Sequence, residues 1–148
     1  MSATQIYIAS AGSGKTFTLV KEYLKIVFRA AHHGNDHVFR NILAITFTNK
    51  ATLEMKQRIV DELKEIAHGK ETDQLESLKD SLPFIKDFKA LADKVLIRIL
   101  HDYSNFNIQT IDSFFQNIVK VFAKELDLPL TYEVIINNEE VLSMPLII

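Results

Sequence analysis

The stretch Ala9-Ser10-Ala11-Gly12-Ser13-Gly14-Lys15-Thr16 decides the fold of this chain, because it has the sequence of a phosphate-binding loop. It follows a short apolar run at residues 6–8, and apolar residues at helical spacing come after it: Phe17, Val20, Leu24 and Val27. A strand, a glycine-rich turn and a helix are the context that such a loop requires. The alternative is an ordinary glycine- and serine-rich loop that caps a helix, and the flanking strand and helix argue against it.

The chemistry of such a loop assigns a role to each of its residues. Glycines let successive backbone N–H groups converge on the β-phosphate at a helix N-terminus. The residues expected to bind nucleotide are Ala9, Ser10, Ala11, Gly12, Ser13, Gly14, Lys15 and Thr16. Lys15 is expected to reach the β- and γ-phosphates and the Thr16 hydroxyl to bind Mg²⁺, which makes these two the expected catalytic residues. Ala9 stands in place of the first consensus glycine, and the Gly-Lys-Thr end is intact.

Composition narrows the class of protein. The 148 residues correspond to one modest domain, short for a complete motor, and 47% apolar with 24% charged residues is ordinary for a globular chain. No apolar run approaches the ~20 residues of a membrane span, so we expect no membrane. The absence of cysteine excludes a disulfide framework and fits a cytoplasmic protein. With a net charge of −2, any DNA contact must come from local geometry.

Apolar spacing predicts strands that alternate with helices. Residues 41–47 are expected to form a strand buried on both faces, and residues 51–67 a helix. Residues 68–80 are expected to form a loop or a weak exposed helix, and an amphipathic helix should start just after Pro83. A strand at residues 106–111 and a helix at 112–126 should follow, the latter with these residues inward: Phe115, Ile118, Phe122 and Leu126. A last strand is predicted at residues 131–136, with Asn138 as the N-cap of another helix. This order indicates an α/β fold with a largely parallel sheet.

The segment from residue 42 to Arg58 begins Ile-Leu-Ala-Ile-Thr-Phe-Thr-Asn-Lys-Ala. It resembles motif Ia of the UvrD/RecB-like superfamily 1 DNA helicases, where this strand-to-helix junction holds single-stranded DNA. The residues expected to contact DNA here are Thr46, Phe47, Thr48, Asn49 and Lys50. Hydroxyls, an amide and a cation can bind phosphates, and Phe47 offers a flat face for a base. The alternative is a strand end with an N-cap at Asn49 and with Phe47 in the core.

A second segment, Asn107-Ile108-Gln109-Thr110-Ile111-Asp112-Ser113-Phe114-Phe115, resembles the T-x-H-S-F element of the same family. The resemblance implies DNA contacts from Thr110 and Ser113. Asp112 replaces the family's histidine, and a carboxylate cannot donate a hydrogen bond to a phosphate at neutral pH. We therefore expect Asp112 to cap the helix that follows.

The form of the phosphate-binding loop and its place near the N-terminus are most similar to the RecB/AddA branch, the motors of helicase–nuclease complexes. The resemblance implies ATP and Mg²⁺ as cofactors, and it implies two partners, single-stranded DNA and a second subunit of a helicase–nuclease complex. Gln5 lies outside the usual context of the family's adenine-reading glutamine. The implied fold is an incomplete first motor lobe: a RecA-like P-loop NTPase with a parallel sheet flanked by helices and a helical insertion. Its expected parts are residues 1–67, the helical segment 68–105, and residues 106–148.

Hydrolysis also needs an apolar strand that ends in an acidic residue, the Walker B element. Ile59-Val60-Asp61-Glu62 lies within an amphipathic helical pattern, and Arg98 interrupts the other candidate. We expect this element to lie beyond Ile148, so that the chain is the N-terminal piece of a helicase and turns ATP over poorly. Two alternatives are a non-catalytic nucleotide- or DNA-binding remnant and a small P-loop kinase, although no arginine-rich lid is apparent.

A histidine-rich segment gives the one metal-like pattern of the sequence: His32, His33, Asp36 and His37. These residues surround Gly34, which is expected to end the first helix in a left-handed conformation. Histidines near a helix C-terminus interact favourably with the helix dipole, so the pattern has a structural explanation without a metal.

Overall fold

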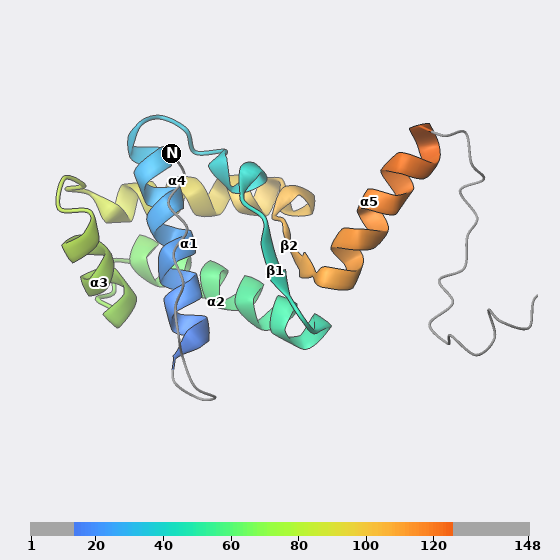
Figure 1. Cartoon of the computed structure of the whole chain (residues 1–148). Coiled ribbons are helices and arrows are strands. Elements are labelled where there is room, and N and C mark those ends of the chain that lie inside the picture. Colours follow the sequence, from blue (N-terminus) through green and yellow to red (C-terminus); the bar gives the residue numbers. More distant parts are fainter. Residues whose placement is uncertain (1–13, 126–148) are drawn as a thin grey trace, which may run out of the picture. The chain divides into compact units, whose positions relative to one another are not determined.

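The computed structural model describes residues 14–125, and residues 1–13 and 126–148 lie outside the described part. The chain divides into one unit at Met1–Ile111 and another at Asp112–Ile148. The elements in chain order are α1 (Lys15–His32), η1 (Val38–Asn41), β1 (Ala44–Thr46), α2 (Asn49–Ala67), α3 (Asp73–Ser81), α4 (Phe88–His101), η2 (Tyr103–Asn105), β2 (Ile108–Thr110) and α5 (Ile111–Glu125) (Figure 1). The strands predicted at residues 6–8 and 131–136, the loop residues 9–13 and Asn138 lie outside the described residues.

The first unit is built around the second helix, α2. This helix packs against α4, against α1 and against both strands. The core is formed by apolar side chains that are almost fully buried, the largest being Phe28, Phe39, Phe106, Leu24, Ile59, Leu63, Ile66, Leu78, Leu82 and Ile99. The described part of the chain is therefore a helix-rich α/β fold with one small sheet. No described helix is both long and apolar enough to cross a membrane.

The sheet has two parallel strands, which confirms the predicted parallel pairing. Ala44 lies opposite Ile108, and Thr46 lies opposite Thr110. Ile108 and Thr110 are buried, whereas Ile45, on the opposite face of β1, is 45% exposed. The prediction of a seven-residue strand buried on both faces is wrong for the described residues. Residues 38–41 form the 3₁₀ turn η1 instead, and α2 packs on the strands from one side.

Three helix boundaries differ from the sequence-based expectation. The helix α2 already begins at Asn49, and its N-cap is Thr48, whose hydroxyl accepts a hydrogen bond from the Ala51 N–H. The prediction of an N-cap at Asn49 is therefore wrong. A regular helix, α3, occupies residues 73–81, where the sequence pattern predicts a loop or weak helix, because its few apolar residues are buried among polar ones. The helix α4 begins at Phe88 with Asp87 as its cap, and not directly after Pro83.

The helix α5 confirms the helix predicted in this region but corrects the role of Asp112. Because α5 begins at Ile111, Asp112 lies inside its first turn and does not precede the helix as a cap residue would. A carboxylate in this turn interacts favourably with the helix dipole. Phe115 and Phe122, predicted to point inward, are exposed in the structure.

The histidine-rich segment ends α1 and holds a buried ion-pair cluster. Gly34 has φ 90°, which confirms the predicted left-handed glycine. Asp36 is only 6% exposed, and its carboxylate lies 3.0 Å from the Arg98 Nε and 3.4 Å from the Lys94 Nζ. The hydrogen bond from Arg98 holds the pKa of Asp36 below its usual range. Among residues 14–125, no group of three His, Asp or Glu side chains is placed to hold a metal ion.

Asp36→Asn is expected to lower the free energy of unfolding by about 1–2 kcal/mol at pH 7, because it removes the charge that Arg98 and Lys94 face. The lowered pKa of Asp36 means that this contribution is present above about pH 4 and is lost as the pH falls through the folded-state value. Urea denaturation of both proteins at pH 7 and at pH 3 measures the difference. Asp93→Asn, on the exposed side of α4, serves as the control. An equal effect of Asp36→Asn at both pH values would contradict the ion-pair account.

Candidate nucleotide and DNA site

The N-terminus of α1 is the part of the phosphate-binding loop that the structure describes. Gly14 is its N-cap, with φ 79°, a left-handed conformation that glycine adopts without strain. The helix starts with the bond from the Thr18 N–H to the Gly14 oxygen, so the preceding N–H groups have no partner inside the helix. The first turn holds no acidic residue. These groups are therefore free of the acidic charge that would oppose a phosphate.

This helix end differs from those of the other helices in the first unit. Side chains cap α2, α3 and α4, through Thr48, Thr72 and Asp87. The N-cap of α1 has no side chain, Lys15 is exposed, and Thr16 is half-buried. A phosphate would supply the acceptors that the uncapped N–H groups lack. The arrangement fits a nucleotide phosphate accompanied by Mg²⁺ near the Thr16 hydroxyl. The other predicted nucleotide-binding residues, Ala9 to Ser13, lie outside the described residues.

The two segments that resemble DNA-contact motifs meet at one edge of the sheet. Thr46 and Thr110 are opposite each other at the carboxyl ends of β1 and β2. The carboxyl ends of parallel strands are where α/β folds most often place their ligands. Ser113 belongs to the second unit, Asp112–Ile148, and is not placed relative to this edge.

The threonine hydroxyls at this edge serve the fold. The Thr46 hydroxyl lies 2.6 Å from the Thr52 hydroxyl and donates to the Thr48 oxygen, 3.2 Å away. The Thr48 hydroxyl caps α2. Thr110 is only 7% exposed. The structure thus uses these three residues to shape the junction between the strands and α2.

The other predicted contact residues point outward. Phe47 is 87% exposed, and Asn49 and Lys50 in the first turn of α2 are exposed as well. The alternative that Phe47 is a core residue is therefore wrong. An exposed aromatic ring beside a helix N-terminus and a lysine offers a base-stacking face next to phosphate-binding groups.

Further along α2, Lys56 holds this helix against the segment that leads into β2. Its ammonium lies 5.1 Å from the centre of the Tyr103 ring and 5.6 Å from that of the Phe106 ring. Burial lowers the pKa of Lys56. Such cation–π contacts favour a fixed side chain. Lys56 therefore supports the junction, while Lys50 is the lysine at its exposed end.

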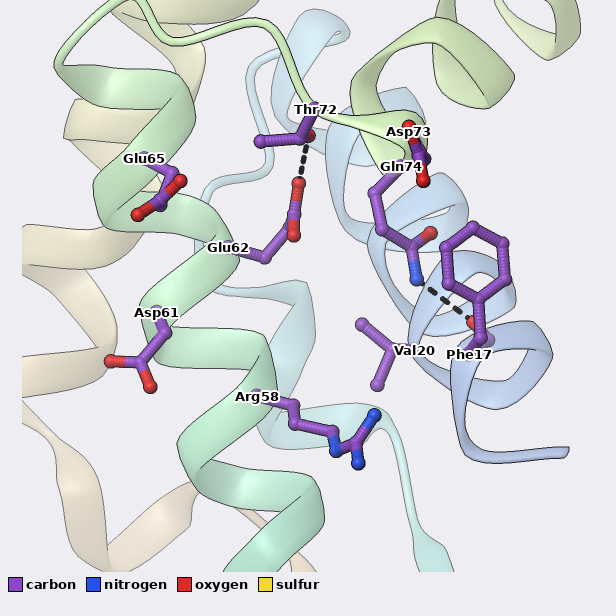
Figure 2. Close-up of a pocket in the computed structure, with 9 residues that line it drawn as sticks. All are labelled: Phe17, Val20, Arg58, Asp61, Glu62, Glu65, Thr72, Asp73 and Gln74. Carbon is purple, nitrogen blue, oxygen red and sulfur yellow. Dashed lines mark hydrogen bonds between the residues drawn. The ribbon is translucent and has the colours of Figure 1, made fainter. Parts of the chain in front are cut away.

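Sequence reasoning missed a cavity of about 340 Å³ between α1, α2 and the start of α3. Its lining is drawn in Figure 2 and consists of Phe17, Val20, Arg58, Asp61, Glu62, Glu65, Thr72, Asp73 and Gln74. Burial raises the pKa of Glu62, which accepts a hydrogen bond from the Thr72 hydroxyl. The spacing of Leu75, Leu78 and Leu82 was the available sequence signal for α3, and hence for this wall of the cavity.

Comparison with known proteins decides the family. The family described as the UvrD/REP helicase N-terminal domain matches residues 2–145. The chain belongs to this family. No solved structure matches it.

The relatives are subunits of helicase–nuclease enzymes. The RecB subunit of the RecBCD enzyme from Buchnera aphidicola is 32% identical over 145 residues, 95% of this chain and 12% of the relative. An ATP-dependent helicase/nuclease subunit from Lactobacillus gasseri is 32% identical over 132 residues, 89% of this chain and 9% of the relative. The RecB subunit from Chlamydia muridarum is 47% identical over 57 residues, 38% of this chain and 5% of the relative. The chain thus spans a small part of these relatives' length.

The exposure of Phe47 predicts that its ring adds little to stability. Phe47→Ala is expected to change the free energy of unfolding by less than about 0.5 kcal/mol, as surface substitutions usually do. Phe39→Ala, which removes a fully buried ring, is the matched control and should cost about 3–5 kcal/mol. Chemical denaturation of the two variants measures both values. A loss for Phe47→Ala as large as that for Phe39→Ala would return Phe47 to the core.

Proposed function

We propose that the chain is the ATP-binding portion of an ATP-dependent DNA helicase or translocase that acts in DNA repair or recombination. The observation that carries the proposal is the uncapped N-terminus of α1 at Gly14, Lys15 and Thr16, in a chain of the UvrD/REP helicase family. The names of the relatives add support, because they are RecB subunits of RecBCD enzymes and subunits of ATP-dependent helicase/nucleases.

In this proposal the described unit is part of a RecA-like P-loop lobe. The parallel register of β1 and β2 and the helices packed on them are consistent with such a lobe. Residues 1–67 would carry the nucleotide loop and the first DNA segment, and residues 68–105 a helical insertion. Residues 106–148 would carry the second DNA segment and the start of a further helical part.

On the nucleotide side, we propose that Ala9 to Thr16 surround the phosphates. The N–H groups at the start of α1 would donate to the β-phosphate, and the Lys15 ammonium would reach the β- and γ-phosphates. The Thr16 hydroxyl would hold Mg²⁺, which neutralises phosphate charge when bound. Neither described strand ends in an acid, because β1 ends at Thr46 and β2 at Thr110. We therefore propose that these residues bind ATP and contribute no Walker B acid to its hydrolysis.

Lys15→Ala tests the nucleotide assignment directly. The variant should lose about 1.5–3 kcal/mol of ATP–Mg²⁺ binding free energy, because a charge-assisted contact to phosphate is removed. Isothermal titration calorimetry measures the affinity. Lys64→Ala, a lysine in the last turn of α2, removes the same charge away from the site and should bind ATP normally. Equal affinities of Lys15→Ala and the unmodified chain would overturn the proposal.

On the DNA side, we propose that Phe47 stacks on a base while Asn49 and Lys50 contact the backbone of a single strand. The three exposed side chains flank the N-terminus of α2, where N–H groups favour phosphate. Thr46, Thr48 and Thr110 would shape this edge through the internal bonds described for the first two and the burial of the third. Ser113 would add a contact from the second unit. A further proposed partner is a second subunit of a helicase–nuclease complex.

Phe47→Ala tests the DNA assignment. Loss of base stacking should weaken binding of an oligothymidine by about 1–3 kcal/mol. Fluorescence anisotropy at several salt concentrations measures the affinity, which should be weak and should fall with salt. Phe84→Ala removes a partly exposed ring that lies against His32 at the far end of α1, so it should leave the affinity unchanged. Equal losses in the two variants would contradict a specific role for Phe47.

A further inference from the structure

The cavity between α1, α2 and α3 contains a buried amide with an unused acceptor. Gln74, in the first turn of α3, is only 5% exposed. Its side-chain N–H donates to the Phe17 backbone oxygen at 2.9 Å (Figure 2). This bond identifies which end of the amide is nitrogen, so the other end is the oxygen. The Gln74 Oε1 is buried and has no hydrogen-bond partner among the described residues. Buried acceptors are normally satisfied, so this one indicates a missing donor.

The fold holds Gln74 firmly at this place. The Thr72 hydroxyl accepts from the Leu75 N–H and donates to the Glu62 carboxylate. This pair of bonds ties the start of α3 to the middle of α2, while the Gln74 amide ties it to the first turn of α1. The three helices therefore fix the amide against the cavity wall, and a rigid polar group is what a specific binding site requires.

The cavity begins where the proposed phosphate site ends. Phe17, which lines it, directly follows Lys15 and Thr16 in the first turn of α1. If phosphates are held at that helix end, the rest of the nucleotide must lie within one nucleoside of it. The Phe17 side chain is 39% exposed, so its ring is accessible for stacking, and Val20 adds apolar surface. A volume of about 340 Å³ lies within the range of small-molecule sites.

The charge of the lining favours the nucleoside over the phosphates. Asp61, Glu65 and Asp73 line the cavity together with Glu62, against the single cation Arg58. Carboxylates accept hydrogen bonds from ribose hydroxyls and from the amino group of a base. They repel phosphates, so they would orient a bound nucleotide with its phosphates toward Lys15.

We propose that this cavity, the Gln74 pocket, binds the adenosine half of ATP, with the Gln74 Oε1 accepting a hydrogen bond from the amino group of adenine and Phe17 stacking on the ring. This inference rests on the proposed function, because it places the phosphates at Lys15. Adenine fits the vacant acceptor because its amino group is a donor, whereas guanine has an acceptor oxygen at the same ring position. Gln74, and not Gln5, is then the residue that recognises the base.

The test compares ATP, GTP and inorganic tripolyphosphate by calorimetry on the full 148-residue chain. Gln74→Leu removes the acceptor at similar volume. It should weaken ATP binding about tenfold and abolish the preference for ATP over GTP, while tripolyphosphate binds as before. Gln116→Leu, on α5 in the second unit, is the matched control and should change none of the three affinities. A Gln74→Leu chain that binds ATP as tightly as the unmodified chain, or a preference for GTP, would overturn the inference.

Photolabelling keeps the test decisive even if Gln74→Leu fails to fold. The unmodified chain is irradiated with 8-azido-ATP, and labelled peptides are identified by mass spectrometry. Label on the peptides that contain Phe17 or Gln74, competed by ATP, supports the pocket, and label confined to other peptides overturns it. Failure of the proposed function has a different signature, because neither ATP nor tripolyphosphate would then bind in a manner that depends on Lys15.

Discussion

The burial of α2 is the constraint on which the rest of the first unit depends. Its apolar stripe, which includes Ile59, Leu63 and Ile66, packs against α4, and its N-terminal half contacts β1 and β2. Because Thr48 caps this helix directly after β1, the direction of the strand and the start of the helix are coupled. The exposed positions of Phe47 and Lys50 follow from that coupling. One side of α2 thus shapes the strand ends, and its middle turns form a wall of the Gln74 pocket.

The two ends of the site are built on different physical terms. The start of α1 is an uncapped helix end, so its attraction for phosphate comes from backbone N–H groups and from Lys15. The edge beside Phe47 has its hydroxyls committed to internal bonds, and what it presents is an aromatic face, an amide and a cation. A chain with a net charge of −2 thereby concentrates its anion-binding groups at helix N-termini instead of spreading cations over its surface.

Much of this was predictable because it depends on short-range order. The Gly-Lys-Thr sequence, the start of α1, the left-handed Gly34 and the parallel pairing of the two strands all agree with the expectation. Helix boundaries after Thr48 and before Phe88 were less accurate, because several neighbouring polar residues compete for the cap and only the packed geometry selects one. The helix α3 was underestimated because its apolar positions are few, and it is stabilised by packing against α1.

The sequence by itself determined the family, the phosphate-loop residues and the two segments that resemble DNA motifs, because each is a local pattern of residue types. Tertiary structure alone decided which side chains those segments leave exposed. Thr46 and Thr110 look alike in the motifs, yet strand pairing and α2 give each a structural role, and Phe47 remains outside the core. The bond from Gln74 to Phe17 joins residues 57 positions apart, a contact that local spacing does not reveal. Exposure and long-range pairing depend on which distant elements pack together, and that is settled only when the whole core forms.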